Sequence, residues 1–131
     1  MEEILRSGFA ALGLPLTKEA LAGYRGYYTA LEDRNRVMNL TAIAGEAETA
    51  RLHFLDCAAL LTAAEFRDRS VIDVGTGAGF PGLALKIAEP SIRLTLLDSL
   101  GKRVQFLEET AADLGLTGVE TVLSRAEEAP E

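Results

Sequence analysis

The sequence has one cysteine, one histidine and no long apolar run. Cys57 lacks a partner, which excludes an intramolecular disulfide and disfavours a thiolate metal site. No run of about eighteen apolar residues could span a membrane, and the opening residues MEEILR lack the basic and apolar regions of a secretory signal. These absences predict a protein of the reducing cytoplasm, without a membrane or secretory address.

An excess of positive charge is also missing. The 131 residues carry a formal net charge of −7, which argues against wholesale coating of a nucleic acid, because phosphate contacts need Lys or Arg. A local basic face remains compatible with that total. The basic residues that flank the segments expected near a ligand are Arg34, Arg36, Arg51, Lys102 and Arg103. Each of them alone is better explained as part of a solvated helix surface.

Helical spacing dominates the first half of the chain. A first helix is predicted to end at Gly13, and a second is predicted to begin after the capping residue Thr17. The apolar positions of these two helices are Leu5, Phe9 and Leu12, then Leu21, Tyr24, Tyr28 and Leu31. A third helix is predicted over residues 46–64, with an apolar face of Leu52, Leu55, Ala59 and Leu60. Core packing explains Tyr24, Tyr27 and Tyr28 better than base stacking does.

The periodicity changes to alternating strands and helices after Ser70. Strands are predicted at residues 71–74, 92–97 and 119–123, and helices at residues 81–88 and 102–114. Pro81 lies in the first turn of its helix, and Gly115 closes the last helix. With 48% hydrophobic residues, the chain fits one compact α/β domain. A helical N-terminal extension, residues 1–66, is attached to the first half of a doubly wound parallel sheet, residues 67–131.

The most informative segment reads VIDVGTGAGFPG over residues 71–82, and the strand after it ends at Asp98. Gly75, Gly77 and Gly79 allow a tight turn and close approach of a ligand, because they carry no Cβ atom. A carboxylate at the end of the next strand can accept two hydrogen bonds from a ribose diol. The pair predicts a ligand that contains a nucleoside.

The glycine spacing bears on which nucleoside cofactor binds. A dinucleotide fingerprint needs G-x-G-x-x-G, but Phe80 occupies the third glycine position. The pattern G-x-G-x-G, preceded by Asp73, is typical of S-adenosylmethionine sites. That cofactor is cationic and carries no phosphate, so a carboxylate beside the turn is electrostatically favourable. A dinucleotide site and a purely structural turn remain the alternatives.

The glycine-rich segment and four others form a combined pattern. The resemblance that they carry covers essentially the whole chain. They read NLTAI, RLHFLD, VIDVGTGAGFPG, LLDSLGKRVQFLE and SRAEE. Together they resemble the RsmG family, also called glucose-inhibited division protein B. The resemblance implies a Rossmann-like methyltransferase fold and S-adenosylmethionine-dependent formation of 7-methylguanosine in bacterial 16S ribosomal RNA. Where the family usually has serine after the aspartate of RLHFLD, this chain has Cys57.

The resemblance also assigns cofactor contacts. It implies that Gly75 and Phe80 contact the cofactor and that Asp98 takes the ribose. Ala126 and Glu127 are implied to meet the adenine edge. Phe80 can wall the methionine end of the site, although packing of the helix against the sheet explains this ring equally well. Taken alone, Glu127 would be explained as a solvated acid near a chain end.

His53 and Asp56 lie three residues apart on one helical face, so they could act together. A metal site there would lack a third ligand, because the chain has no other histidine. Hydrogen bonds that tie the N-terminal helices to the sheet are the structural explanation for this pair. The resemblance instead places Asn39, Arg51, His53 and Asp56 on the substrate side of the pocket.

The chemistry implied by the resemblance needs little acid or base catalysis. Guanine N7 offers a free lone pair, so methyl transfer from a sulfonium proceeds by in-line displacement once the atoms are positioned. Carboxylates near the pocket stabilise the positive charge as it moves from the sulfur to the base.

The resemblance further implies a seven-stranded sheet, of which only three strands are recognisable in the sequence. We therefore expect a C-terminally truncated chain, whose strand at residues 71–74 has an unpaired edge that promotes self-association. A fragment that binds S-adenosylmethionine without turnover is thus an alternative to the rRNA methyltransferase. A nicotinamide-dependent oxidoreductase is the least favoured hypothesis.

Overall fold

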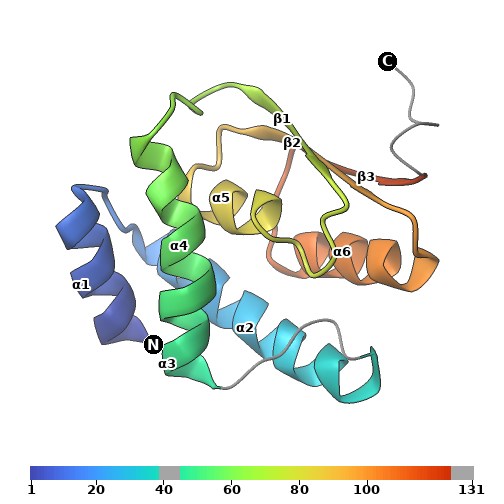
Figure 1. The fold of residues 1–131 in the computed structure, drawn as a ribbon, viewed down its shortest axis with the longest axis horizontal. Helices are drawn as coiled ribbons and strands as arrows, with labels where there is room; N and C mark the ends of the chain where they lie inside the picture. The colour runs from blue at the N-terminus through green and yellow to red at the C-terminus, as the bar shows by residue number, and fades with distance from the viewer. Residues whose placement is uncertain (39–44, 125–131) are drawn as a thin grey trace.

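The computed structural model describes residues 1–38 and 45–124 of the chain. Its N-terminal part is helical and its C-terminal part alternates strands with helices, as the sequence predicts (Figure 1). The N-terminal helices are α1 at Glu2–Leu12, α2 at Lys18–Met38, α3 at Glu46–Thr49 and α4 at Leu55–Ala58. A π-helical turn at Ala50–Phe54 joins α3 to α4, and a 3-10 turn at Ala59–Thr62 follows α4.

Local signals set the end of α1 and the beginning of α2. Gly13 adopts a φ of +72°, the left-handed conformation in which glycine commonly ends a helix, and its N–H donates to the Ala10 carbonyl at 3.0 Å. The Thr17 hydroxyl oxygen accepts the Ala20 N–H at 3.0 Å, which is N-cap geometry. Both predicted boundaries are confirmed.

The predicted apolar face of α2 is wrong by one position. Tyr27 is fully buried, whereas Tyr28 is only partly buried. The buried side chains Tyr24, Tyr27 and Leu31 follow the spacing of one helical face, and Tyr28 lies at the edge of that face. The buried stripe therefore presents two tyrosines to the rest of the molecule.

The predicted apolar face of the third helical stretch is also partly wrong. Leu52 and Leu60 are 63% and 41% exposed, while Phe54 and Cys57 are buried. The π-helical turn at Ala50–Phe54 holds more residues per turn than an α-helix, so it rotates the inward face away from the positions that regular α-helical spacing predicts.

The sheet contains three parallel strands in the order β1-β2-β3. The strands are β1 at Ser70–Val74, β2 at Arg93–Asp98 and β3 at Val119–Leu123, and the helices between them are α5 at Gly82–Ala88 and α6 at Gly101–Asp113. Each element lies within one residue of its predicted bounds. Pro81 is the N-cap of α5 and not part of its first turn. The predicted α/β class and the partial Rossmann-like architecture are confirmed.

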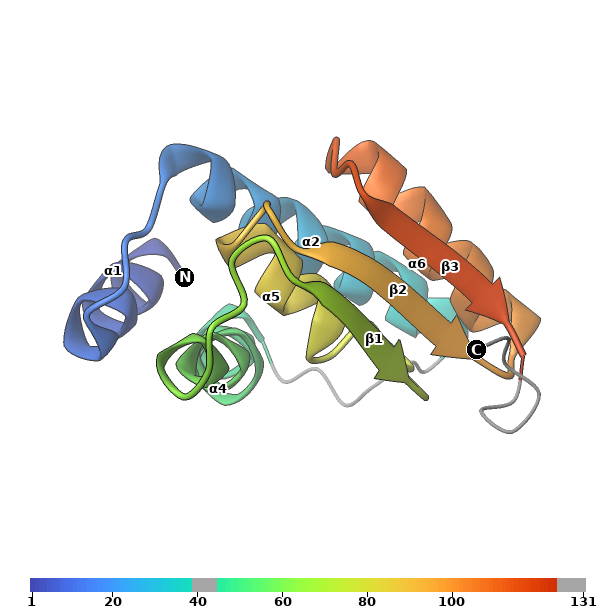
Figure 2. The ribbon, with the colours of Figure 1, turned by 90° about the horizontal axis from the view of Figure 1, so that it is seen from above.

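The helices α5 and α6 cover one face of the sheet, and α2 packs against these two helices on their side away from the sheet (Figure 1 and Figure 2). A continuous buried cluster runs from Leu5 and Phe9 of α1 to Leu107 of α6, so the N-terminal helices and the sheet share one core. On the opposite face of the sheet, Ile72 and Val74 of β1 are 67% and 56% exposed. Within the described residues, β1 pairs on one side only, with β2.

Among residues 1–38 and 45–124, no helix combines the length and the apolar character that crossing a membrane requires.

Candidate functional site

The glycine turn lies at the carboxyl end of β1, between β1 and α5. Gly75, Gly77 and Gly79 have φ values of +69°, +61° and +104°, a region that disfavours residues with a Cβ atom. The N–H groups of Gly75 and Thr76 both donate to the Leu97 carbonyl, at 2.8 and 3.2 Å. A Cβ atom added to Gly75 or Gly77 would meet no atom within 4 Å. The turn is therefore anchored to β2 and open on the side where a ligand would approach.

Asp98 anchors the turn from the end of β2. Its Oδ2 accepts the Gly77 N–H at 2.9 Å, and its Oδ1 accepts the Leu100 N–H at 3.0 Å. The Arg103 Nη1 lies 3.7 Å from Oδ1. Only 3% of the Asp98 surface is exposed. The carboxylate predicted to take the ribose thus also holds the glycine turn in place.

Asp73 flanks the turn on its other side. Its Oδ2 accepts the N–H of Gly82, the first residue of α5, at 2.9 Å. A Cβ atom on Gly82 would lie 2.8 Å from this oxygen, so glycine allows α5 to begin close to β1. Burial raises the pKa of Asp73 and the nearby Asp98 charge raises it further, whereas the hydrogen bond from Gly82 opposes this rise. Two carboxylates therefore bracket the turn, an arrangement that favours a cationic ligand over a phosphate.

Tyr27 reaches the turn from α2 and was not among the site residues predicted from the sequence. Its hydroxyl donates to the Ala78 carbonyl at 2.6 Å, and the whole residue is buried. The only sequence signal was its place in a tyrosine-rich helical stripe, which does not distinguish Tyr27 from Tyr28.

Phe80 follows the turn and lies two residues before the first residue of α5. Its ring is half-buried and packs against Tyr27, with 5.4 Å between the ring centroids. The imidazole of His53 stacks on the same ring, with 4.8 Å between centroids and 14° between planes. Phe80 therefore takes part in helix-to-sheet packing and keeps a partly exposed surface beside the turn.

The structure brings His53, but not its predicted partners, into contact with the turn segment. Arg51 and Asp56 are exposed, and the side chains of His53 and Asp56 make no hydrogen bond within the described part of the chain. Ring stacking on Phe80 replaces the expected hydrogen-bonded tie to the sheet. Burial raises the pKa of the Cys57 thiol to about 12, so this side chain stays a protonated core residue at neutral pH.

Three predicted site residues, Asn39, Ala126 and Glu127, lie outside the described residues. Among the described ones, no three His, Cys, Asp or Glu side chains are grouped in a way that could hold a metal ion.

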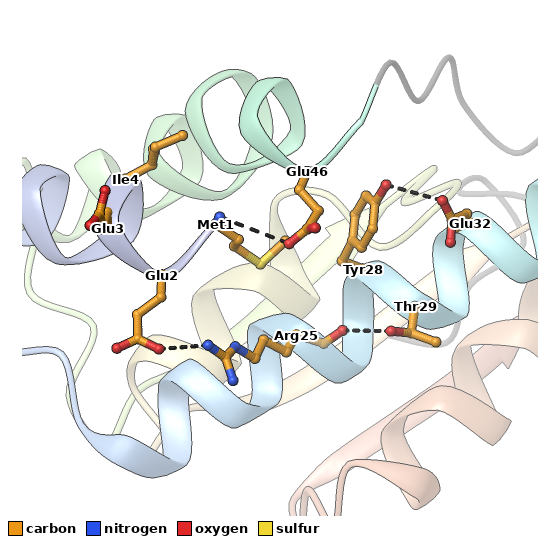
Figure 3. Close-up of a pocket in the computed structure, with 9 residues that line it drawn as sticks. All are labelled: Met1, Glu2, Glu3, Ile4, Arg25, Tyr28, Thr29, Glu32 and Glu46. Carbon is orange, nitrogen blue, oxygen red and sulfur yellow. Dashed lines mark hydrogen bonds and ion pairs between the residues drawn. The ribbon is translucent and has the colours of Figure 1, made fainter.

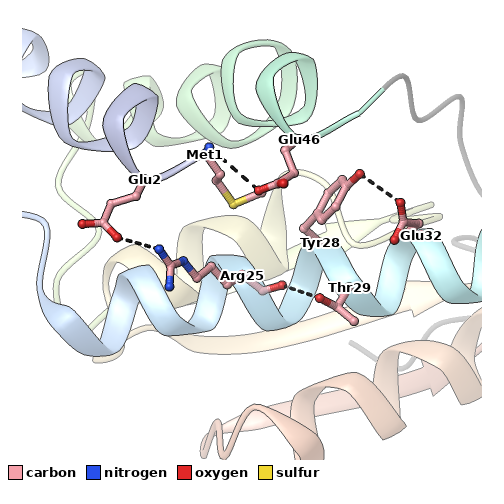
Figure 4. A network of polar contacts seen from close by, with 7 residues as sticks. All are labelled: Met1, Glu2, Arg25, Tyr28, Thr29, Glu32 and Glu46. Carbon is pink, nitrogen blue, oxygen red and sulfur yellow. Dashed lines mark hydrogen bonds and ion pairs between the residues drawn. The ribbon is translucent and has the colours of Figure 1, made fainter.

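A separate open hollow lies between α1, α2 and α3 (Figure 3). It is lined by Met1, Glu2, Glu3, Ile4, Arg25, Tyr28, Thr29, Glu32 and Glu46. Arg25 pairs with Glu2 at 2.5 Å, and the Tyr28 hydroxyl donates to Glu32 at 3.2 Å (Figure 4). The hollow shares no residue with the glycine turn, and its acidic lining does not suit an RNA phosphate. We therefore assign the functional site to the turn.

Comparison with known proteins shows the family to which the chain belongs. The family model described as GidB, rRNA small subunit methyltransferase G, matches residues 21–131. The ribosomal RNA small subunit methyltransferase G of Carboxydothermus hydrogenoformans is 46% identical over 127 residues, covering 97% of this chain and 54% of the relative. That of Pelotomaculum thermopropionicum is 42% identical over 129 residues, covering 98% of this chain and 54% of the relative. The chain thus spans about half the length of these curated relatives, and it belongs to the GidB family of rRNA small subunit methyltransferases.

Proposed function

We propose that this chain provides the S-adenosylmethionine-binding part of a methyltransferase that forms 7-methylguanosine in 16S ribosomal RNA. In this proposal, residues 67–131 form the first half of the cofactor-binding α/β domain and residues 1–66 form its helical extension. The observation that carries the proposal is the open glycine turn held between Asp73 and Asp98. An rRNA substrate implies that the enzyme acts in the cytoplasm.

The residues around the turn fit this cofactor. S-adenosylmethionine supplies, when bound, an electrophilic methyl group on a sulfonium cation. The carboxylates of Asp73 and Asp98 favour that charge, and the open side of Gly75 and Gly77 admits a ligand close to the backbone. Each carboxylate oxygen of Asp98 accepts one backbone N–H and retains a second lone pair for a ribose hydroxyl.

The remaining cofactor contacts in the proposal come from Gly79, Phe80, Ala126 and Glu127. Gly79 completes the turn, and the half-buried ring of Phe80 walls the methionine end. Ala126 and Glu127 meet the adenine edge as donor and acceptor.

The proposed substrate side comprises Asn39, Arg51, His53 and Asp56. The stack of His53 on Phe80 supports its assignment to this side, and the exposed side chains of Arg51 and Lys102 are available to RNA phosphates. Arg34, in contrast, already pairs with Glu109 at 2.6 Å. Guanine N7 needs no proton removed, so the chain's contribution is to position the base and to stabilise the moving positive charge with its carboxylates.

A binding module without turnover is the second candidate function. It is favoured by one observation, that the chain spans about half the length of its curated relatives. A nicotinamide-dependent oxidoreductase is disfavoured, because Phe80 replaces the third glycine of the dinucleotide fingerprint and two carboxylates bracket the turn.

Transfer of labelled methyl from S-adenosylmethionine to small-subunit rRNA separates these functions. The enzyme hypothesis predicts label in 7-methylguanosine after nuclease digestion. Binding of S-adenosylmethionine without transfer would favour the binding module for this chain. Binding of NAD, with no response to S-adenosylmethionine, would contradict both.

A further inference from the structure

Tyr27 connects the N-terminal helices to the glycine turn. It lies on α2, is fully buried, and donates its hydroxyl hydrogen to the Ala78 carbonyl at 2.6 Å across 51 residues of sequence. Its ring stacks on Phe54, with 5.5 Å between centroids, and contacts Phe80 at 5.4 Å. Phe54 and Phe80 also contact each other, with 6.1 Å between ring centroids, so the phenol packs within one aromatic cluster.

The carbonyl groups of the turn show why this hydroxyl matters. The Thr76 carbonyl accepts the Gly79 N–H at 3.0 Å, and the Gly79 carbonyl accepts the Leu83 N–H at 2.8 Å. The Ala78 carbonyl is instead held by the Tyr27 side chain. Ala78 is only 5% exposed, so without the hydroxyl its carbonyl would be buried without this partner. The Tyr27 hydrogen bond thus adds a contact on the core side to those with Leu97 and Asp98 that hold the turn on the side of β2.

The Tyr27 hydroxyl also fixes how closely the turn approaches the core. A Cβ atom on Gly79 would lie 2.5 Å from the Tyr27 oxygen and 3.1 Å from Leu83 and Leu107. The oxygen therefore packs directly against the Gly79 backbone. This contact defines the closed, core-facing side of the turn, opposite the open side at Gly75 and Gly77.

We infer that Tyr27 is a positioning residue for the cofactor turn. Its hydroxyl holds the Ala78 carbonyl on the core side, which leaves the preceding Gly77 N–H directed at Asp98 and the open face of the turn preformed for the ligand. The inference deepens the proposed function and rests on it for the role in binding. The effect on the ligand-free turn does not depend on that function.

Tyr24 offers a matched control on the same helix. It is fully buried, its ring lies 4.8 Å from Phe54, and its hydroxyl donates to the Ala84 carbonyl at 2.9 Å. Ala84 belongs to α5 and not to the glycine turn. Tyr24→Phe therefore removes the same kind of buried hydrogen bond from the same aromatic cluster and leaves the contacts of the turn intact.

The test compares Tyr27→Phe and Tyr24→Phe in three measurements. These are urea unfolding, amide hydrogen exchange of the ligand-free protein, and calorimetric binding of S-adenosylhomocysteine. We expect both variants to unfold at similarly reduced urea concentrations. Only Tyr27→Phe is expected to accelerate exchange at Gly77 and Gly79, about threefold to tenfold, and to weaken S-adenosylhomocysteine binding by a similar factor, the size of one hydrogen bond.

Two results would overturn the inference. One is unchanged exchange at Gly77 and Gly79 in Tyr27→Phe, and the other is an equal loss of affinity in Tyr24→Phe. If the wild-type protein fails to bind S-adenosylhomocysteine, the proposed function is contradicted, while the exchange comparison still decides whether Tyr27 positions the turn.

Discussion

Replacement of Asp98 by alanine is expected to destabilise the fold as well as to weaken cofactor binding. The carboxylate accepts the N–H groups of Gly77 and Leu100 at 2.9 and 3.0 Å, and it is 3% exposed. Alanine offers neither N–H an acceptor. The variant therefore removes the side-chain tie between the glycine turn and the end of β2, while the backbone hydrogen bonds to the Leu97 carbonyl remain.

The magnitude follows from these two contacts. Leaving a buried donor unsatisfied costs about 1 to 3 kcal/mol, and both N–H groups are only partly buried, so the two together should cost about 2 to 4 kcal/mol. The Arg103 ion pair adds little, because its N···O distance is 3.7 Å and the arginine side chain is 41% exposed. Loss of the ribose hydrogen bonds should weaken S-adenosylmethionine binding by about 1.5 to 3 kcal/mol.

Urea unfolding and calorimetry on the same preparations check both effects. Glu108→Ala is the matched control, because it removes one exposed carboxylate from α6 and should change the unfolding free energy by less than about 0.5 kcal/mol. Asp98→Asn keeps one acceptor oxygen and should fall between wild type and Asp98→Ala. An Asp98→Ala variant as stable as Glu108→Ala would refute the anchoring role. Equal affinity of folded Asp98→Ala and wild type would refute the ribose assignment.

Three further predictions concern the turn and the strand before it. Because the folded-state pKa of Asp73 lies above its ordinary value of 3.8, its ionised form opposes folding, and this cost appears as pH rises from 3.8 through the folded-state value. As the pH rises through this range, Asp73→Asn should therefore become more stable relative to the wild type. Urea unfolding free energies of the two proteins that differ by the same amount at every pH would contradict this. Gly77→Val should lower the free energy of unfolding by about 2 kcal/mol or more and bind the cofactor more weakly than Asp98→Ala does. A β-branched residue suits neither a φ of +61° nor the close approach of a ligand. A variant with the melting curve and the affinity of the wild type would contradict this prediction. Within the described residues β1 has one unpaired edge, and this edge with the 67% exposed Ile72 should make the wild-type chain self-associate, which Ile72→Lys should reduce. A monomeric wild-type chain in sedimentation, with a sharp thermal melt, would refute the expectation.

Much of the fold could be predicted because local signals mark its boundaries. Gly13 and Thr17 fix helix ends through their own backbone and side-chain geometry, and such effects are visible in the sequence. The inward faces were harder to predict. Tyr27 and Tyr28 are adjacent and similar, so only the packing of α2 against its neighbouring helices decides which is buried. The π-helical turn that exposes Leu52 has no comparable local signal.

The candidate site was predictable in its residues and not in its contacts. The spacing of Gly75, Gly77 and Asp98 indicated a nucleoside site, and the structure places all three together. That Asp98 Oδ2 already accepts the Gly77 N–H depends on how β1 and β2 align in the sheet. The Tyr27 contact depends on the approach of a helix 51 residues away in the sequence. Neither relation leaves a local pattern.

Titration of the protein with S-adenosylmethionine, followed through its backbone amide NMR signals, tests most directly whether the glycine turn binds this cofactor. The proposal predicts saturable binding to one site, with the largest shifts at Gly75, Gly77 and the residues following Asp98, and no response to NAD at the same concentrations. No saturable response, or shifts confined to the hollow between α1, α2 and α3, would contradict the claim.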